Sequence, residues 1–311
     1  MSSIEKAIER LAKSKAANPK PVVDRSISDI GATAPVATGA PVSGQVLTPK
    51  AVPGAETPDR GTGAAAEAAK VPNARITLDY QALAKLGYVV PDNDNKQTAE
   101  EYRVIKRPIV MNAFGKGAAP IPHGNLISIA SSLPSEGKTF TALNLGLSIS
   151  SEMDSTVLLI DGDVIKSSLT KLIGAESRRG LIDLLEDPNC KVSDVILDTQ
   201  NPKLKIIPAG TNSAHSTELL ASKAMERLLT EFAERYNDRI ILFDSPPMLA
   251  TSEATVLNHL MGQVVMVVEA GNTPVDAIKD SLSKLDADKA IGLVLNKSRT
   301  SKVGNYFGTY Y

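Results

Sequence analysis

The chain has 311 residues, 42% of them hydrophobic, and a formal net charge of −1 at pH 7. This apolar content is enough for one large or two small globular domains, and the small net charge excludes the strong positive field of a general nucleic-acid binder. The single cysteine, Cys190, excludes an internal disulfide framework and is typical of a protein of the reducing cytosol. We interpret Cys190 as an unreactive thiol in a surface loop.

Neither a membrane span nor a signal peptide is predicted. No stretch approaches the ~20 consecutive apolar residues that a spanning helix requires. The N-terminus, "MSSIEKAIERLAKSKAA", lacks the apolar core of a signal peptide. We therefore expect a cytoplasmic protein that only a partner would tether elsewhere.

The first 75 residues predict little packed structure. Apolar residues recur at helical spacing within residues 1–18, which favours a short amphipathic helix that docks on a partner or a membrane; a frayed helix without a partner is the alternative. Residues 19–75 are rich in Ala, Pro, Gly and Thr and have too few large apolar groups to offset the entropy cost of ordering. We predict a disordered, flexible linker there.

Order is predicted to resume in a short segment, residues 76–98, that ends in a polar break. A helix follows at residues 99–107, "AEEYRVIKR". We expect it to end at Pro108 or soon after, because proline has no N–H to donate and clashes with the preceding turn. The main domain is predicted over residues 99–305, and residues 306–311 form a tyrosine-rich tail.

Short β-branched apolar runs alternate with helical patterns from residue 125 onward. The runs "NLISIA", "TVLLIDGD", "LKIIPA", "RIILFDS", "GQVVMVVEA" and "AIGLVLNK" predict strands, and residues 138–151, 216–236 and 274–286 predict helices. Uninterrupted apolar strands that alternate with helices are typical of an α/β fold with a mostly parallel, doubly wound sheet and helices on both faces. Ligands of such folds bind at the carboxyl ends of the strands.

A phosphate-binding loop is predicted at residues 131–139, "SSLPSEGKT", between the first of these strands and a helix. In such a loop backbone N–H groups surround the phosphates, Lys138 reaches the β- and γ-phosphates, and the Thr139 hydroxyl ligates Mg²⁺. Ser132 stands where the strict G-x-x-x-x-G-K-[ST] pattern has its first glycine. The residues predicted to contact the nucleotide here are Pro134, Ser135, Glu136, Gly137, Lys138, Thr139 and Phe140.

Three carboxylates follow two of the strands. Asp161 and Asp163 end "VLLIDGD", and Asp244 ends "IILFD". Buried carboxylates are costly unless a metal or hydrogen bonds compensate, so beside a phosphate loop these acids and Thr139 predict a Mg²⁺–nucleotide site. The alternative for either Asp161 or Asp163 is a cap of the following turn. Asn296, at the end of the last strand, either reads the adenine edge or caps a turn.

The motifs "SSLPSEGKT", "LLIDGDVIKS" and "IILFDSPP" resemble the Walker A, A′ and B motifs of bacterial tyrosine kinases, and "PAGTNSAHSTELLAS" and the terminal "GNYFGTYY" resemble further segments of that family. The resemblance covers roughly residues 96–311. It is closest to the cytoplasmic autokinases that accompany exosortase-linked exopolysaccharide clusters, which also begin with a segment similar to "SSIEKAIERL". It implies a P-loop fold and ATP-dependent tyrosine autophosphorylation that regulates exopolysaccharide synthesis or export.

The resemblance also implies roles for individual residues. Lys138 and the acids Asp161, Asp163 and Asp244 are the implied catalytic residues: Lys138 holds the phosphates of ATP, and Asp161 accepts the tyrosine proton. Asp163 and Asp244 organise Mg²⁺ together with Thr139. The implied phosphoacceptors are the tail residues Tyr306, Tyr310 and Tyr311, which we expect to be modified in trans.

The family resemblance extends to partners and assembly. Glu100, Arg103 and Lys106 are similar to the family's E-x-x-R-x-x-R helix, which implies contacts between subunits of a ring. The other implied partners are a membrane polysaccharide co-polymerase, whose cytoplasmic segment activates the kinase, and a cognate tyrosine phosphatase, but no nucleic acid. The implied location is the cytoplasm, with recruitment to the inner face of the plasma membrane.

Departures from the family pattern leave two other functions open. Ile165 stands where the A′ motif has an arginine, with Lys166 following it, and Lys106 replaces the last arginine of the helix motif. One alternative is a partition-like ATPase of the Par or Min type. Leu133 counts against it, because those proteins carry a signature lysine at that position. The other alternative is a nucleotide-binding regulator of a polysaccharide exporter without catalytic activity.

Overall fold

The computed structural model describes residues 74–91, 95–211, 215–236, 238–287 and 289–298. The predicted amphipathic helix, almost all of the predicted linker and the tyrosine-rich tail lie outside these residues. Within the described ranges, none of the helices has the length and apolar character needed to cross a membrane.

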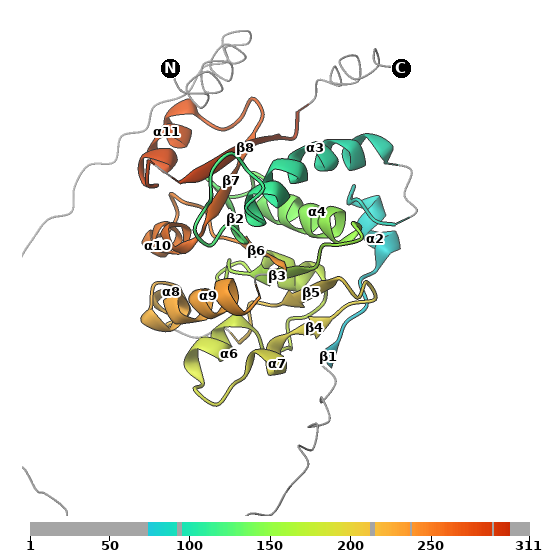
Figure 1. Ribbon diagram of the computed structural model, residues 1–311, viewed down its shortest axis with the longest axis vertical. Coiled ribbons are helices and arrows are strands. Elements are labelled where there is room, and N and C mark those ends of the chain that lie inside the picture. The colour runs from blue at the N-terminus through green and yellow to red at the C-terminus, as the bar shows by residue number, and fades with distance from the viewer. Residues whose placement is uncertain (1–73, 92–94, 212–214, 237, 288, 299–311) are drawn as a thin grey trace, which may run out of the picture. The chain divides into compact units, whose positions relative to one another are not determined.

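The described residues build one eight-stranded sheet in the order β1-β4-β5-β3-β6-β2-β7-β8 (Figure 1). The strands are β1 (Ala74–Arg75), β2 (Leu126–Ser131), β3 (Val157–Asp161), β4 (Leu197–Asp198), β5 (Leu204–Ile207), β6 (Ile240–Asp244), β7 (Gln263–Glu269) and β8 (Ala290–Asn296). Neighbouring strands of this sheet are parallel, except that β4 and β5 are antiparallel. The predicted α/β fold with a mostly parallel, doubly wound sheet is confirmed.

Helices cover both faces of the sheet. They are α2 (Tyr80–Lys85), α3 (Lys96–Ala113), α4 (Lys138–Ser150), α5 (Ser168–Leu172), α6 (Leu181–Glu186), α7 (Val192–Val195), α8 (Ser216–Leu220), α9 (Lys223–Arg235), α10 (Ser252–Leu260) and α11 (Val275–Ser283). In Figure 1, α3 and α4 lie on one face, and α8, α9 and α10 on the other. Within β2, Ile127 and Ile129 pack with residues of α3 and α4, whereas Leu126 packs with residues of α9 and α10. Burial on both faces explains why the strands are apolar at successive positions.

Helix α3 continues past Pro108 to Ala113, whereas the sequence predicts an end near the proline. A proline at this position cannot donate to the carbonyl of Val104. Both Val104 and Pro108 are exposed, so water can reach that carbonyl. The opposite side of α3 is anchored by the buried Tyr102 and Ile109, which keeps the helix in place despite the missing hydrogen bond.

Two other local predictions differ from the structure. The helix predicted over residues 216–236 is two helices, because Ser222 accepts a hydrogen bond from the backbone N–H of Met225 and starts α9 anew. Cys190, predicted in a surface loop, is only 8% exposed and belongs to the core that contains Val195. Burial raises the pKa of its thiol, which agrees with an unreactive role.

The short segment before α3 is part of the same core as the main domain. Strand β1 pairs with β4, and Leu83, Tyr88 and Val90 are buried in the cluster that also contains residues of α4. The backbone N–H of Val89 donates to the side chain of Asn144 at 2.7 Å. This segment is therefore fixed against α4, the helix that follows the phosphate loop.

Candidate functional site

The loop between β2 and α4 has the backbone geometry of a phosphate-binding loop. Ser135 and Gly137 both have positive φ angles, 69° and 101°, which turn the chain into the N-terminus of α4. This φ at Gly137 favours glycine, and a Cβ atom there would also displace the side-chain amide of Asn296 from its contact with the loop. The thirteen-residue helix α4 begins at Lys138, and its N-terminal N–H groups and dipole favour an anion.

Side chains from other strands hold this loop in shape. The buried carboxylate of Glu136 accepts hydrogen bonds from the backbone N–H of Leu133 and from the Thr273 hydroxyl. Asn296 donates to the carbonyl of Glu136 at 2.8 Å, and Lys297 donates to the carbonyl of Ser135 at 2.8 Å. The structure therefore gives Glu136 and Asn296 a bracing role, and the adenine-reading alternative for Asn296 stays a prediction.

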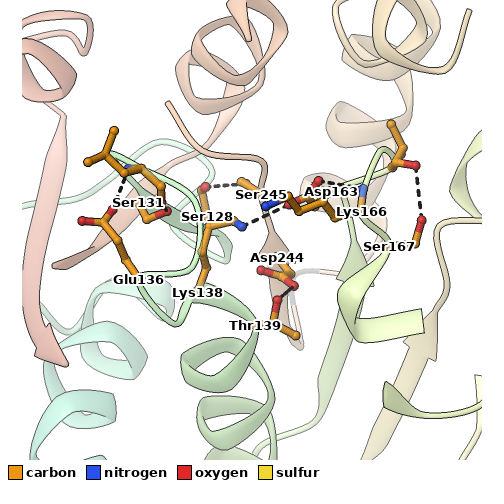
Figure 2. A network of polar contacts seen from close by, with 12 residues as sticks. Ser128, Ser131, Glu136, Lys138, Thr139, Asp163, Lys166, Ser167, Asp244 and Ser245 are labelled. Atoms are coloured by element: carbon orange, nitrogen blue, oxygen red, sulfur yellow. Dashed lines mark hydrogen bonds and ion pairs between the residues drawn. The ribbon is translucent and has the colours of Figure 1, made fainter. Parts of the chain in front are cut away.

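The three predicted acids gather beside the loop, as Figure 2 shows for Asp163 and Asp244. Asp161 and Asp244 are direct register partners on the neighbouring strands β3 and β6. Lys138 forms a buried ion pair with Asp163, with 3.0 Å between Nζ and Oδ2. Thr139 donates from its hydroxyl to Oδ2 of Asp244 at 2.6 Å. The parallel sheet thus brings one lysine, one hydroxyl and three carboxylates together at the carboxyl ends of its central strands.

One carboxylate is also engaged as a turn cap. Oδ2 of Asp161 accepts hydrogen bonds from the backbone N–H and the hydroxyl of Thr170, at 2.8 and 2.7 Å. Its other oxygen, Oδ1, and Oδ1 of Asp244 are buried, and neither has a hydrogen-bond partner among the described residues. Oδ2 of Asp161 therefore caps the following turn, as one alternative predicted, whereas Oδ1 takes no part in the cap.

Burial raises the pKa of both register partners. The pKa of Asp161 is raised to about 6, chiefly by desolvation, although the hydrogen bonds from Thr170 oppose the shift. The pKa of Asp244 is raised to about 8 by its complete burial and then by the nearby charge of Asp161, although Lys138 and Thr139 act in the opposite direction. The acids repel one another and lack a full set of hydrogen-bond partners. A bound cation would neutralise their charge and favour the ionised carboxylates.

The donor atoms fit Mg²⁺ when nucleotide phosphates complete its coordination. The described residues hold no group of three or more His, Cys, Asp or Glu side chains arranged for a metal. Mg²⁺ is commonly bound by one or two carboxylates together with substrate phosphates and water, so such a group is not required. Oδ1 of Asp244, which has no partner among the described residues, and the hydroxyl of Thr139 are hard oxygen donors of this kind.

A cleft of about 270 Å³ opens over the loop. It is lined by Tyr88, Ser135, Gly137, Lys138, Thr139, Lys166, Ser168 and Leu172. Of the predicted nucleotide contacts, Pro134, Glu136, Phe140 and Asn296 are not among the lining residues. Tyr88, Ser168 and Leu172 belong to no recognised motif and were not predicted from the sequence.

Thr273 and Lys297, which brace the loop, were also not predicted. They follow β7 and β8, and the rule that sites gather at strand ends would have identified them.

The A′ segment places a lysine at this cleft. The side chain of Ile165, which stands where the resembled motif has arginine, is 56% exposed and does not line the cleft, whereas Lys166 does. The backbone N–H of Lys166 donates to Oδ1 of Asp163, which fixes the turn between the two residues (Figure 2). The positively charged side chain of the A′ segment therefore stands at residue 166, one position after the residue that corresponds to the motif's arginine.

The predicted oligomer-contact residues do not share one face of α3. Glu100 and Arg103 are exposed and form an ion pair with 2.8 Å between their atoms. Lys106 is only 6% exposed; its Nζ donates to the carbonyl of Ser148 at 2.6 Å and pairs with Glu152 at 3.0 Å. Six residues at about 100° each rotate Lys106 by 240° from Glu100, which is why Lys106 faces α4 while Glu100 is exposed.

Comparison with known proteins places the chain in a family. The AAA domain family model matches residues 124–286, more than half of the chain. The succinoglycan biosynthesis transport protein ExoP of Rhizobium meliloti strain 1021 is 32% identical over 235 residues, which are 74% of this chain and 28% of ExoP. The tyrosine-protein kinase YwqD of Bacillus subtilis strain 168 is 27% identical over 216 residues, 68% of this chain and 86% of YwqD.

Among solved structures, the VpsO kinase domain has a TM-score of 0.55 and 27% identity, and the match covers 66% of this chain and 98% of that domain. This chain therefore spans nearly all of a kinase domain but only about a quarter of the length of ExoP. The resemblance to bacterial tyrosine kinases, predicted from the motifs, is confirmed. With its phosphate loop, its strand-end acids and the match over residues 124–286, the chain belongs to the AAA domain family of P-loop proteins.

Proposed function

We propose that the chain is an ATP-dependent protein tyrosine autokinase that phosphorylates Tyr306, Tyr310 and Tyr311 of a neighbouring copy. The observation that carries the proposal is the meeting of Lys138 and Thr139 with strand-end carboxylates at one edge of the sheet. YwqD is named a tyrosine-protein kinase and the VpsO structure is named a kinase domain, and each match covers about two thirds of this chain, which supports phosphate transfer to tyrosine.

Nucleotide binding requires an exchange of partners at Lys138. Its ammonium group is paired with Asp163 in the cleft, and a nucleotide phosphate would compete for the same cation. The N–H groups at the start of α4 supply the remaining donors. A bound Mg²⁺ would supply charge neutralisation, held by Thr139, Asp244 and the phosphates of ATP. Phosphoryl transfer consists largely of such positioning and charge neutralisation, so few further groups are needed.

Asp161 is the proposed acceptor of the tyrosine proton. Its Oδ1 has no hydrogen-bond partner among the described residues, while Oδ2 is held in place by Thr170. Asp163 is paired with Lys138, and Asp244 shares a hydrogen bond with Thr139. A fixed carboxylate with one available oxygen is suited to general-base work.

Lys166 is the proposed replacement for the A′ arginine. It lines the cleft together with Lys138 and Thr139, so its ammonium group can reach a bound phosphate. A lysine gives a point charge without the paired N–H groups of arginine, so it retains charge neutralisation and loses bidentate geometry.

The C-terminal tyrosines are proposed to enter the site of a neighbouring subunit. Strand β8 ends at Asn296, beside the phosphate loop of its own subunit, and only residues 297–305 separate it from the tyrosines, which leaves little chain for folding back into the same site. Each phosphotyrosine adds close to two negative charges, so a phosphorylated tail would repel its neighbours. Glu100 and Arg103 on α3 are the proposed subunit contacts.

We also propose that the kinase serves exopolysaccharide synthesis or export. ExoP is named a succinoglycan biosynthesis transport protein, which supports a membrane polysaccharide co-polymerase as the activating partner. Autophosphorylation that acts as a switch also requires removal of phosphate, so a tyrosine phosphatase is the further proposed partner. The proposed location is the cytoplasmic side of the plasma membrane.

The test compares the wild-type chain with Lys138→Met, each expressed as the sole copy of the chain in its native host, so that any activating partner is present and no wild-type copy can phosphorylate the variant. We expect phosphotyrosine on the wild-type chain and none on the variant when both are purified and blotted. A wild-type chain without phosphotyrosine, or an equal signal from Lys138→Met, would contradict the proposal. Lys116→Met, at an exposed lysine that does not line the cleft, is the matched control.

A further inference from the structure

A segment outside the matched family region contributes to the cleft over the phosphate loop. The family match begins at residue 124, whereas Tyr88 lies ahead of α3 and lines the cleft beside Thr139 and Lys166. Its aromatic ring packs on Phe140, the residue after Thr139, with 4.8 Å between ring centroids. Tyr88 therefore lies at the N-terminal end of α4, where the loop passes into the helix.

The backbone around Tyr88 is fixed independently of any ligand. Gly87, with φ of 88°, ends the turn after α2, and the backbone N–H of Tyr88 donates to the carbonyl of Leu83 at 3.0 Å. The next N–H, that of Val89, donates to Asn144 on α4. With a side chain that is only 6% exposed, Tyr88 is held in one place, and ordering it on ligand binding costs little.

The position of Tyr88 corresponds to the terminal-phosphate end of the cleft. Tyr88 and Thr139 line the same cleft, and burial followed by the charge of Asp244 raises the pKa of the Tyr88 hydroxyl to about 12. Asp244 is bonded to Thr139, the hydroxyl that in phosphate loops ligates the metal between the β- and γ-phosphates.

We propose that Tyr88 is a nucleotide-contacting residue whose hydroxyl donates a hydrogen bond to the terminal phosphate of a bound nucleoside triphosphate. The inference rests on the nucleotide site of the proposed function. It adds that a residue from the segment before α3 discriminates between a nucleoside triphosphate and a diphosphate. Both this segment and the P-loop domain are then needed for full nucleotide affinity.

The test is a calorimetric titration of the full chain, freed of nucleotide, with a non-hydrolysable ATP analogue and separately with ADP, both with Mg²⁺. Tyr88→Phe removes only the hydroxyl and keeps the ring on Phe140. We expect the variant to bind the ATP analogue about tenfold more weakly and ADP with nearly unchanged affinity, since a hydrogen bond to a charged group is lost. Unchanged affinity for the analogue, or an equal loss for both nucleotides, would overturn the proposal.

Tyr80→Phe provides the matched control. Tyr80 lies on α2 and packs against the same core without lining the cleft, so the same chemical change there should alter neither affinity. The readout is binding, so it separates this inference from the proposed function. A chain that binds the analogue through Tyr88 and never forms phosphotyrosine would refute the kinase and leave the role of Tyr88 intact.

Discussion

At the scale of single residues, the site contains more carboxylate oxygens than the positively charged side chains and hydrogen-bond donors of the described residues satisfy. Lys138 neutralises Asp163, but the adjacent Asp161 and Asp244 each keep one buried oxygen without a partner among the described residues. Ser132 stands where the loop pattern has its first glycine, yet Ser135 and Gly137 still adopt positive φ angles. The loop therefore keeps its backbone shape despite the departure from the strict motif.

The acids predict a pH dependence of stability in the absence of nucleotide and metal. The folded-state pKa values of Asp161 and Asp244, about 6 and about 8, lie above the ordinary value of 3.8. Each group binds its proton more tightly in the folded chain, so its stabilising contribution is complete below about pH 4 and is lost as the pH rises through its folded pKa. We expect the free energy of unfolding by urea to fall between pH 4 and 8.

Two variants check that assignment. Asp244→Asn removes the group with the higher pKa and should flatten the upper part of the pH profile. Asp154→Asn, at an exposed position outside the site, should leave the profile unchanged. A profile that Asp244→Asn does not alter would show that the buried carboxylate has no such linkage.

A second residue-scale prediction concerns the lysine of the A′ segment. Lys166→Ala should lower the rate of phosphotyrosine formation about tenfold or more, because a cation positioned at a transferring phosphate is lost. Lys166→Arg should retain most of the rate. The neighbouring Ile165→Ala changes an exposed side chain that does not line the cleft and should have no effect. Initial rates with radiolabelled ATP measure all three, and a wild-type rate in Lys166→Ala would exclude this role.

At the scale of elements, α3 separates a structural face from an exposed one. Lys106→Met removes the ion pair of a buried ammonium group with the half-exposed Glu152 and a hydrogen bond to the carbonyl of Ser148, so the free energy of unfolding should fall by about 2 kcal/mol. Arg103→Ala removes an exposed pair and should change it by less than about 0.5 kcal/mol. Urea unfolding of the two variants checks the contrast, and equal effects would mean that the burial of Lys106 has no energetic consequence.

The strands were predictable because their burial demands a simple pattern. Parallel strands covered on both faces need uninterrupted apolar residues, and the runs that became β2, β3, β5, β6, β7 and β8 have them. Strands β1 and β4 have two residues each, too few to produce a pattern. The passage of α3 beyond Pro108 depends on contacts with α4 that local propensity does not contain.

The same limit applies to the site. Motifs identified Lys138, Thr139 and the three acids, because phosphate loops require particular residue types at fixed spacing. The inward turn of Lys106, the bracing role of Asn296 and the position of Tyr88 arise from packing between elements distant in the sequence. No single stretch of sequence encodes those contacts.

At the scale of the whole molecule, the sheet order brings the phosphate loop, the acids and the last strand to one edge. Strands β3, β6, β2, β7 and β8 are successive neighbours, so residues after each of them meet at the site. Because β8 ends at the phosphate loop, the last residues of the sheet lie next to the catalytic groups of their own subunit. The route of phosphate to the tail, within a subunit or between subunits, is therefore the central question of function.

A mixing experiment measures that route directly. A chain with Lys138→Met keeps its tail and serves as acceptor, while a chain that ends at residue 305 keeps its site and serves as donor. Both are incubated with ATP and Mg²⁺, and mass spectrometry maps phosphate on the acceptor. We predict phosphate on Tyr306, Tyr310 or Tyr311 of the acceptor in the mixture and none on either chain alone. An unmodified acceptor, where the wild-type chain under the same conditions does modify its tail, would contradict transfer between subunits.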